Sequence, residues 1–212
     1  ELARLADHYG FFILDDDPYG QLRFAGVGLV PLAELSDRVI TMGSASKVLA
    51  PGLRVGWTEG PAQVVEAMTR LKQARDLHTS SLSQAIAADI FGDDAFVFSH
   101  LARVRETYRQ SADVLSAAIE DAAAAFDMDV RWREPQGGMF LWLTVPGVDT
   151  TELLAAAIKC GVAFVPGAAF APRGDQHQGA LGESMRLCYS TLGADSLREA
   201  TERLFTAATR TR

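Results

Sequence analysis

Apolar positions along the 212-residue chain follow a helical period in some stretches and form short continuous runs in others. Leu2 and Leu5 have helical spacing, and Gly10 stands where a glycine commonly ends a helix. Two short, mainly apolar runs follow at residues 11–14 and 38–43, and we predict that both are buried strands. This order of helix, strand, loop and strand predicts an α/β layer with a parallel or mixed sheet.

The middle of the chain is predicted to be helical. One helix is expected from Pro61 and another over residues 81–91, ending at Gly92. Apolar residues then recur every three or four positions from Leu101 to Ile119, which predicts one long helix.

A second group of short strands is expected after the long helix. Residues 129–146 predict two strands separated by a turn at the Gly137–Gly138 pair. A helix at 151–161, strands at 162–167 and 185–190, and a helix at 195–208 complete the pattern. We place a domain boundary near Asp93, so that residues 1–92 form one domain and residues 93–212 form a small α+β domain.

Composition and charge narrow the possible partners. The net charge of −7 argues against nucleic acid as a partner of this segment, because phosphate binding needs a basic face. No apolar run approaches the roughly 18 residues that a membrane helix needs. Cys160 and Cys188 form neither a metal-ligand spacing nor a disulfide framework, so we expect two buried thiols, no metal and a cytoplasmic location.

Polar residues follow each of the two predicted strands of the first domain. The acidic stretch DDDPYG at 15–20 follows the first strand, and GSASK at 43–47 follows the second. A solvated acidic turn would explain the first stretch by itself. Ligands bind at the carboxyl ends of strands in α/β sheets, however, and two such ends together favour a binding site.

Lys47 is the most unusual of these residues, because the chain has only three lysines against seventeen arginines. Burial lowers the affinity of an amine for its proton, and a lysine in a partly apolar pocket can form a Schiff base with a carbonyl. Ser44, Ser46 and Arg54 offer donors for a phosphate group. Asp16 could hold a pyridine nitrogen protonated, and the small residues at 43–46 leave room for a planar ligand. This set suits an aldehyde cofactor that carries a phosphate and a ring nitrogen.

At the level of motifs the chain resembles the class I/II aminotransferases, which are fold type I pyridoxal-phosphate enzymes. The resemblance rests on ILDDDPYGQLRF, GSASKVLAPGLRVGW, EPQGGMFLWL, VAFVPGAAF and MRLCYS, in this order. It points especially to the branch of 2-aminoadipate aminotransferases and of the aminotransferase-like half of MocR regulators. The fold implied is the C-terminal part of the large domain, with a mixed, mostly parallel sheet, followed by the small α+β domain. The family's first-half elements of the cofactor site are not found before Asp16, so we expect the chain to begin in mid-protein.

The resemblance also implies roles for individual residues around the cofactor. Asp16 would pair with the pyridinium nitrogen of pyridoxal 5'-phosphate, and Tyr19 with its phenolic oxygen. Asp15 and Asp17 flank Asp16, so the assignment could be displaced by one residue. Lys47 would be the lysine that binds the cofactor covalently.

Ser44, Ser46 and Arg54 would bind the cofactor phosphate, and Arg186 would hold the substrate α-carboxylate as a bidentate pair. An arginine on a strand often forms an ion pair with a neighbouring acidic residue and has no further role. Only the resemblance assigns Arg186 to substrate binding. The implied protein is a cytoplasmic homodimer acting on an amino acid and a 2-oxo acid, with 2-oxoglutarate as amino acceptor.

Other readings of the Lys47 motif are weaker. Ser44 and Lys47 satisfy the S-x-x-K pattern of serine β-lactamases, but the S-D-N and K-T-G motifs of those enzymes are absent. Thr41 and Ser46 stand where a P-loop would need glycines. The hypothesis that stays open is a MocR-type transcriptional regulator, in which the same fold senses cofactor or an amine and a separate winged helix binds DNA. We favour the enzyme.

Overall fold

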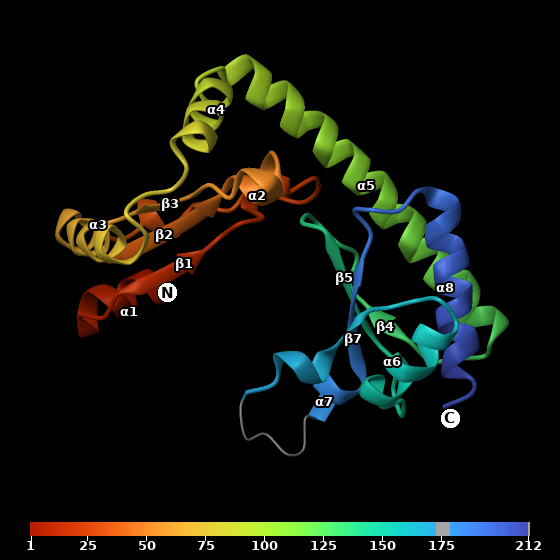
Figure 1. Ribbon diagram of the computed structural model, residues 1–212. Coiled ribbons are helices and arrows are strands. Elements are labelled where there is room, and N and C mark those ends of the chain that lie inside the picture. Colours follow the sequence, from red (N-terminus) through yellow and green to blue (C-terminus); the bar gives the residue numbers. More distant parts are fainter. Residues whose placement is uncertain (173–178, 212) are drawn as a thin grey trace. The chain divides into compact units, whose positions relative to one another are not determined.

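The computed structural model describes residues 1–172 and 179–211 and contains two compact units, Glu1–Arg105 and Glu106–Arg212 (Figure 1). The division lies within the long helix α5, Asp94–Ala125, and so beyond the boundary that we placed at Asp93. Our assignment of 1–92 and 93–212 to a large and a small domain stays a prediction.

The first unit begins with the predicted helix and strand. Helix α1 spans Leu2–Tyr9 and ends at Gly10, whose φ of 77° lies in the left-handed region and whose N–H bonds to Ala6 O at 2.8 Å. Strand β1 follows at Ile13–Asp16, two residues later than the apolar run 11–14 suggested. The carboxylates Asp15 and Asp16 therefore belong to the strand itself.

A mixed three-stranded sheet in the order β1-β2-β3 forms the centre of this unit (Figure 1). Strand β2, Val39–Ser44, runs parallel to β1, and Asp16 lies opposite Met42. Strand β3, Gly56–Glu59, pairs antiparallel with β2, with Trp57 opposite Gly43. The sequence pattern did not reveal β3, because a four-residue strand with glycine at its start has little periodicity.

Burial of β1 is confined to one face. Ile13 and Val39 are 7% and 3% exposed, and they form a core cluster with Ala6 of α1 and the partly buried Leu32. Leu14 points to the other face and is 67% exposed. The expectation of a strand buried on both faces is therefore wrong for the described residues, since only the side toward α1 is covered.

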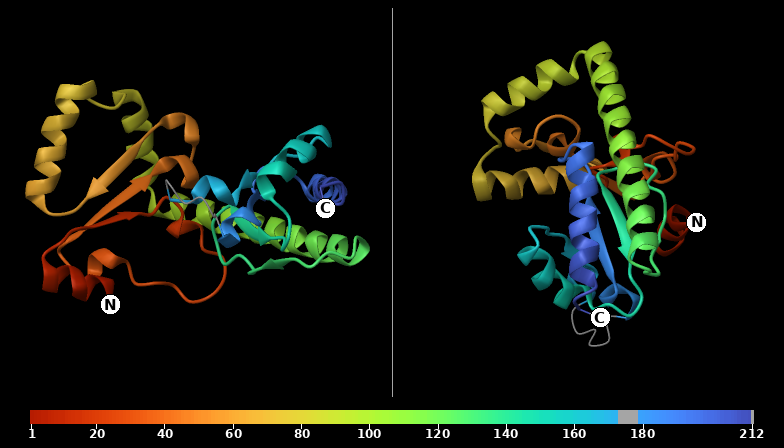
Figure 2. Two further views of the ribbon diagram at one scale, coloured as in Figure 1. Left: turned by 90° about the horizontal axis from the view of Figure 1, so that it is seen from below. Right: turned by 90° about the vertical axis from the view of Figure 1, so that its right-hand side faces the viewer.

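Short helices and two longer ones complete the first unit (Figure 2). Helix α3 covers Ala62–Asp76 and α4 covers Ser81–Phe91, with Gly92 as the C-cap that we expected. The helix predicted from Pro61 is confirmed as α3, and none of its residues is buried. The short segments are η1 Gly20–Leu22, η2 Leu32–Glu34, α2 Ala45–Val48 and η3 Pro51–Leu53.

The second unit holds an antiparallel sheet in the order β4-β5-β7-β6. Its strands are β4 Arg131–Trp132, β5 Phe140–Thr144, β6 Val165–Pro166 and β7 Ser184–Cys188. Its remaining helical segments are α6 Thr150–Lys159, η4 Gly167–Phe170, α7 Gly179–Gly182 and α8 Ala194–Ala208. The predicted strand pair at 129–146 is confirmed, with residues 133–139 between its strands, whereas the strand expected at 162–167 shortens to two residues.

The two faces of this sheet differ strongly. Leu141, Leu143 and Met185 are at most 1% exposed on one face. Tyr189 continues this buried face, and its ring lies 6.5 Å from that of Tyr108 in α5. The opposite face is only partly covered: Ser184 is buried, whereas Cys188 is exposed, which corrects the expectation of a buried thiol.

Cys160 is half-buried rather than fully buried. Within the described part of the chain, none of the helices combines the length and the apolar character that a membrane crossing requires.

Candidate functional site

The turn that follows β2 carries three of the predicted site residues, Ser44, Ser46 and Lys47. Ser44 ends β2 and caps α2, its hydroxyl oxygen accepting a hydrogen bond from Ser46 N at 3.1 Å. Serine suits this position because its oxygen satisfies an N–H that the first helical turn leaves unpaired. The N–H of Ala45 bonds to Val55 O at 3.0 Å, so the start of α2 is also anchored to the chain entering β3.

Lys47 lies on this single helical turn and is half-buried. Its amine has no hydrogen-bond or ion-pair partner among the residues that the structure describes. Lys72, by contrast, pairs with Asp76 at 2.9 Å on the exposed side of α3. Lys47 therefore has an amine that is available to a ligand.

Arg54 reaches back to the same turn. Its Nη1 donates to Ser46 Oγ at 3.3 Å and to Pro51 O at 3.4 Å. Its backbone has φ 54° and ψ 36°, a left-handed conformation that costs a residue with a side chain about 1–2 kcal/mol. Strained residues of this kind persist where the surrounding structure holds them, and they are common at functional sites.

These groups fit a phosphate. The hydroxyls of Ser44 and Ser46 each accept one hydrogen bond inside the turn, which leaves the proton of each free for donation to an anion. The guanidinium of Arg54 keeps further N–H donors beyond the one that bonds to Ser46. Two hydroxyl donors, one guanidinium and one unpaired amine within a short turn match a ligand with a phosphate and a carbonyl group.

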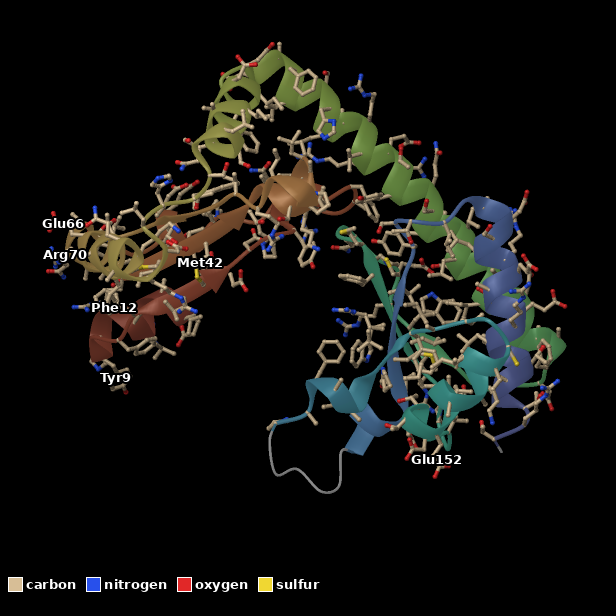
Figure 3. All side chains as sticks on the ribbon, viewed as in Figure 1. Tyr9, Phe12, Met42, Glu66, Arg70 and Glu152 are labelled. Carbon is tan, nitrogen blue, oxygen red and sulfur yellow. The ribbon has the colours of Figure 1, made fainter. Side chains whose placement is uncertain are left out.

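The three aspartates after Leu14 have different environments. Asp17 Oδ1 accepts hydrogen bonds from Tyr19 N at 3.3 Å and Gly20 N at 2.6 Å, so its carboxylate closes the turn. Asp15 is on the same side of β1 as the buried Ile13. Asp16 is exposed on the other side, where its register partner is Met42. The side chain of Met42 is labelled in Figure 3.

Ser44 shares that side, because it is two residues beyond Met42 on β2. The structure thus brings Asp16 to the same sheet face and the same strand ends as the Lys47 turn. Tyr19 is half-buried and directly precedes η1, so it too follows this strand end.

Arg186 belongs to the second unit and lies on the face of its sheet that is opposite Leu141 and Met185. Its guanidinium carbon is 4.0 Å from the centroid of the Phe140 ring and 5.2 Å from that of Phe170. Trp142 is its neighbour on β5, and the Trp142 ring meets Phe170 edge to face at 5.4 Å. Aromatic faces attract a guanidinium and hold its plane, since the ring quadrupole is negative over the face.

Arg186 also lacks the acidic neighbour that an ordinary structural arginine would have. No carboxylate in residues 1–172 or 179–211 forms an ion pair with it, and its Nε is buried without a hydrogen-bond partner. A buried, unpaired charged donor is costly unless a ligand supplies an acceptor. This environment suits the binding of a carboxylate.

The structure corrects one feature of the expected pocket. The space beside Gly43 is filled by the indole of Trp57, since a Cβ on Gly43 would lie 2.3 Å from Trp57 Cε2. Ala45 is completely buried. These two small residues permit close packing and leave no room for a planar ligand on their side.

The sequence analysis did not identify three aromatic residues near the candidate site: Trp57, Phe140 and Phe170. The apolar alternation of Phe140 and Trp142 along one strand was the available signal, because it places both side chains on the face of Arg186.

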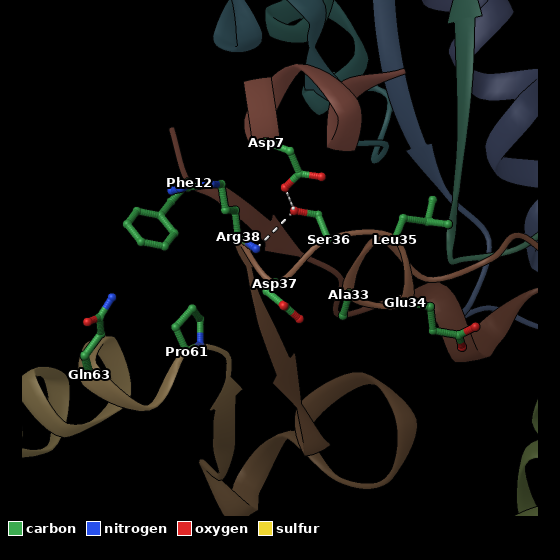
Figure 4. Close-up of a pocket in the computed structure, with 10 residues that line it drawn as sticks. All are labelled: Asp7, Phe12, Ala33, Glu34, Leu35, Ser36, Asp37, Arg38, Pro61 and Gln63. Carbon is green, nitrogen blue, oxygen red and sulfur yellow. Dashed lines mark hydrogen bonds between the residues drawn. The ribbon is translucent and has the colours of Figure 1, made fainter. Parts of the chain in front are cut away.

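A cavity of about 840 Å³ lies away from the Lys47 turn, where β1 and β2 begin (Figure 4). Asp7 accepts a 2.6 Å hydrogen bond from Ser36 Oγ, and Ser36 Oγ in turn accepts one from Arg38 N at 3.1 Å. Phe12 lies under Arg38 at 5.8 Å. These polar groups satisfy one another, and none of the predicted site residues lines this cavity.

Comparison with known proteins places the whole arrangement in one family. The model of the family described as aminotransferase class I and II matches residues 1–204. An aromatic-amino-acid aminotransferase from Thermococcus litoralis is 36% identical over 207 residues, which cover 96% of this chain and 47% of the relative. The crystal structure of alpha-aminoadipate aminotransferase from Thermus thermophilus, complexed with N-(5'-phosphopyridoxyl)-L-leucine, superposes with a TM-score of 0.88 at 32% identity. The match covers 99% of this chain and 53% of that structure.

The chain therefore spans about half the length of the curated relatives that it matches. A protein described as an uncharacterized HTH-type transcriptional regulator of Bacillus subtilis also matches, with 27% identity over 94% of this chain and 40% of the regulator. The fold is that of fold type I aminotransferases. By its motifs, its structure and the family model, the chain belongs to the class I and II aminotransferases.

Proposed function

We propose that the protein is a pyridoxal-phosphate-dependent aminotransferase that moves an amino group between an amino acid and a 2-oxo acid. The turn after β2 carries this proposal, because an unpaired lysine amine adjoins two hydroxyls and a strained arginine that suit a phosphate. The crystal structure of the Thermus thermophilus relative contains a phosphopyridoxyl compound, which supports the same cofactor class.

The residues divide the chemistry among them. When bound, the cofactor supplies an aldehyde that reacts with amines and a ring that accepts electrons. Lys47 holds it covalently through Nζ, and as a free amine it moves a proton to and from the substrate α-carbon. Ser44, Ser46 and Arg54 bind the phosphate and thereby fix where the reacting atoms lie.

With the cofactor bound, the carboxylate of Asp16 would pair with the ring nitrogen and keep it protonated, and Tyr19 would pair with the phenolic oxygen. Arg186 binds the substrate α-carboxylate with two N–H donors in a fork. The aromatic residues beneath its guanidinium support this role, as does the unpaired Nε.

Borohydride trapping tests the proposal. The complete protein is incubated with pyridoxal phosphate, reduced, digested and mapped by mass spectrometry. We expect the reduced adduct on Lys47 in the parent and in Lys72→Arg, and we expect no adduct in Lys47→Arg. An adduct confined to Lys72 or Lys159 would remove the basis of this assignment.

A second candidate function is an effector-sensing domain of a MocR-type transcriptional regulator. The match to the Bacillus subtilis regulator supports it. Both candidates predict the adduct on Lys47, so turnover separates them. Transamination between amino acids and 2-oxoglutarate favours the enzyme, whereas cofactor binding without turnover, together with DNA binding, favours the regulator.

We also propose a homodimer that acts in the cytoplasm. Val27, Leu29 and Val30 form an apolar stretch in the first unit and are 84%, 78% and 59% exposed. An apolar surface of this kind marks an interaction site. Light scattering of the purified protein checks the stoichiometry, and fractionation of cells checks the compartment.

A further inference from the structure

His100 of α5 contacts the turn that carries Lys47. Its Nε2 lies 2.9 Å from the backbone oxygen of Val48, the residue after Lys47. Both residues belong to the unit Glu1–Arg105, although 52 positions separate them in sequence. His100 is not one of the site residues described above.

The chemistry of the two groups fixes the direction of the hydrogen bond. A carbonyl oxygen can only accept, so Nε2 of His100 carries a proton and donates it. Val48 is the last residue of α2, and the last carbonyls of a helix find no partner within it. His100 therefore acts as a side-chain cap at the C-terminal end of the turn, as Ser44 does at its N-terminal end.

The imidazole is held firmly in place. Its ring is parallel to that of Phe96, one helical turn earlier, with an interplanar angle of 3° and a centroid distance of 5.9 Å. The surroundings are apolar and include Leu49, Phe91 and Leu101 around a narrow cavity. A hydrogen bond in such an environment is stronger than one exposed to water.

The helix that carries Lys47 needs this support. It has four residues. An isolated helix of that length is unstable, because the free-energy cost of nucleating a helix exceeds the stabilisation from the hydrogen bonds of one turn. The N–H groups of Leu49 and Ala50 both bond to Ala45 O, at 2.9 and 3.0 Å, which closes the turn locally. Tertiary contacts at both ends must fix its orientation.

We propose that His100 is a positioning residue for Lys47. Through Val48 it fixes the backbone of the turn, so that the lysine amine is presented to the aldehyde of the cofactor. The inference rests on the proposed function of Lys47 as the cofactor-binding lysine. This role acts through the backbone of Val48 and needs no contact of His100 with the cofactor or the substrate.

Three kinds of variant separate hydrogen bonding from packing. His100→Gln keeps an N–H donor at a similar reach, whereas His100→Phe keeps an aromatic ring and removes the donor. His100→Leu is a second donor-free variant in case the phenylalanine does not fit. Leu101→Ala is the matched control, because it disturbs the same apolar contacts at a residue that is 7% exposed and leaves the donor intact.

Two readouts are measured on the complete protein. The first is the rate at which pyridoxal phosphate forms the borohydride-reducible adduct on Lys47. The second is hydrogen exchange of a peptide covering residues 45–53 without cofactor, which reports the turn directly. One hydrogen bond contributes about 0.5–1.5 kcal/mol, so the donor-free variants should label about 2- to 12-fold more slowly and exchange correspondingly faster.

The proposal requires that the labelling rate and the exchange rate of His100→Gln stay within about twofold of the parent. This difference is smaller than the effect expected from the loss of one hydrogen bond. Leu101→Ala should lower the melting temperature and leave the labelling rate unchanged. Donor-free variants that label at the parental rate overturn the proposal, and so does a Gln or Leu101→Ala variant that slows equally. If the parent itself forms no adduct on Lys47, the proposed function fails, and exchange of the turn still shows whether His100 holds it.

Discussion

Replacing Gly43 by alanine tests the packing that shapes the strand end beside the Lys47 turn. The added Cβ would lie 2.3–2.5 Å from three atoms of the Trp57 indole, well inside van der Waals contact. Phe91 limits the movement of the indole on one side, because the two rings meet at a steep angle with a centroid distance of 5.8 Å. Either the ring or the end of β2 must move.

The size of the effect follows from two opposing contributions. Overpacking of this kind costs about 1–3 kcal/mol. Gly43 does not have a positive φ, so alanine also gains about 0.4–1 kcal/mol by restricting the unfolded chain. The difference is a destabilisation of about 1 kcal/mol in the free energy of unfolding.

Urea unfolding of the protein with Gly43→Ala, Trp57→Leu and the double variant measures this. In the Trp57→Leu background the clash is gone, and Gly43→Ala should then stabilise by about 0.4–1 kcal/mol. The change of sign between the two backgrounds is the expected result. An equal cost of Gly43→Ala in both backgrounds would refute the assignment of the effect to the Trp57 ring.

Three further substitutions address the proposed site. Asp16→Asn preserves shape and removes charge, so cofactor should still bind while transamination falls by orders of magnitude; parental turnover would reassign the role to a neighbouring aspartate. Arg54→Asn suits the left-handed backbone, so we expect stability within about 1 kcal/mol of the parent and weaker binding of pyridoxal phosphate by equilibrium dialysis. Phe140→Leu removes the ring under Arg186 at 4.0 Å, and loss of about 0.5–2 kcal/mol should raise KM for the amino acid about 2- to 30-fold with little change in kcat. An unchanged KM would show that the ring does not position the guanidinium.

Several features of the protein were predictable from the sequence because they depend on neighbours a few residues apart. Helix α1 with its Gly10 terminus and the long helix α5 follow from helical periodicity and from a glycine that tolerates positive φ. The capping of α2 by Ser44 is equally local. The spacing of Ser44, Ser46, Lys47 and Arg54 likewise depends on one continuous segment of chain, and its resemblance to the aminotransferase family agrees with the family model.

The tertiary structure decided what depends on segments far apart in sequence. Three features result from strand pairing and packing, which leave no local pattern in the sequence. Trp57 fills the space beside Gly43, only one face of β1 is buried, and aromatic rings lie beneath Arg186. The contact between His100 and Val48 is of the same kind. Periodicity specifies which face of an element is apolar, but the identity of the side chain opposite that face is fixed only when the elements pack together.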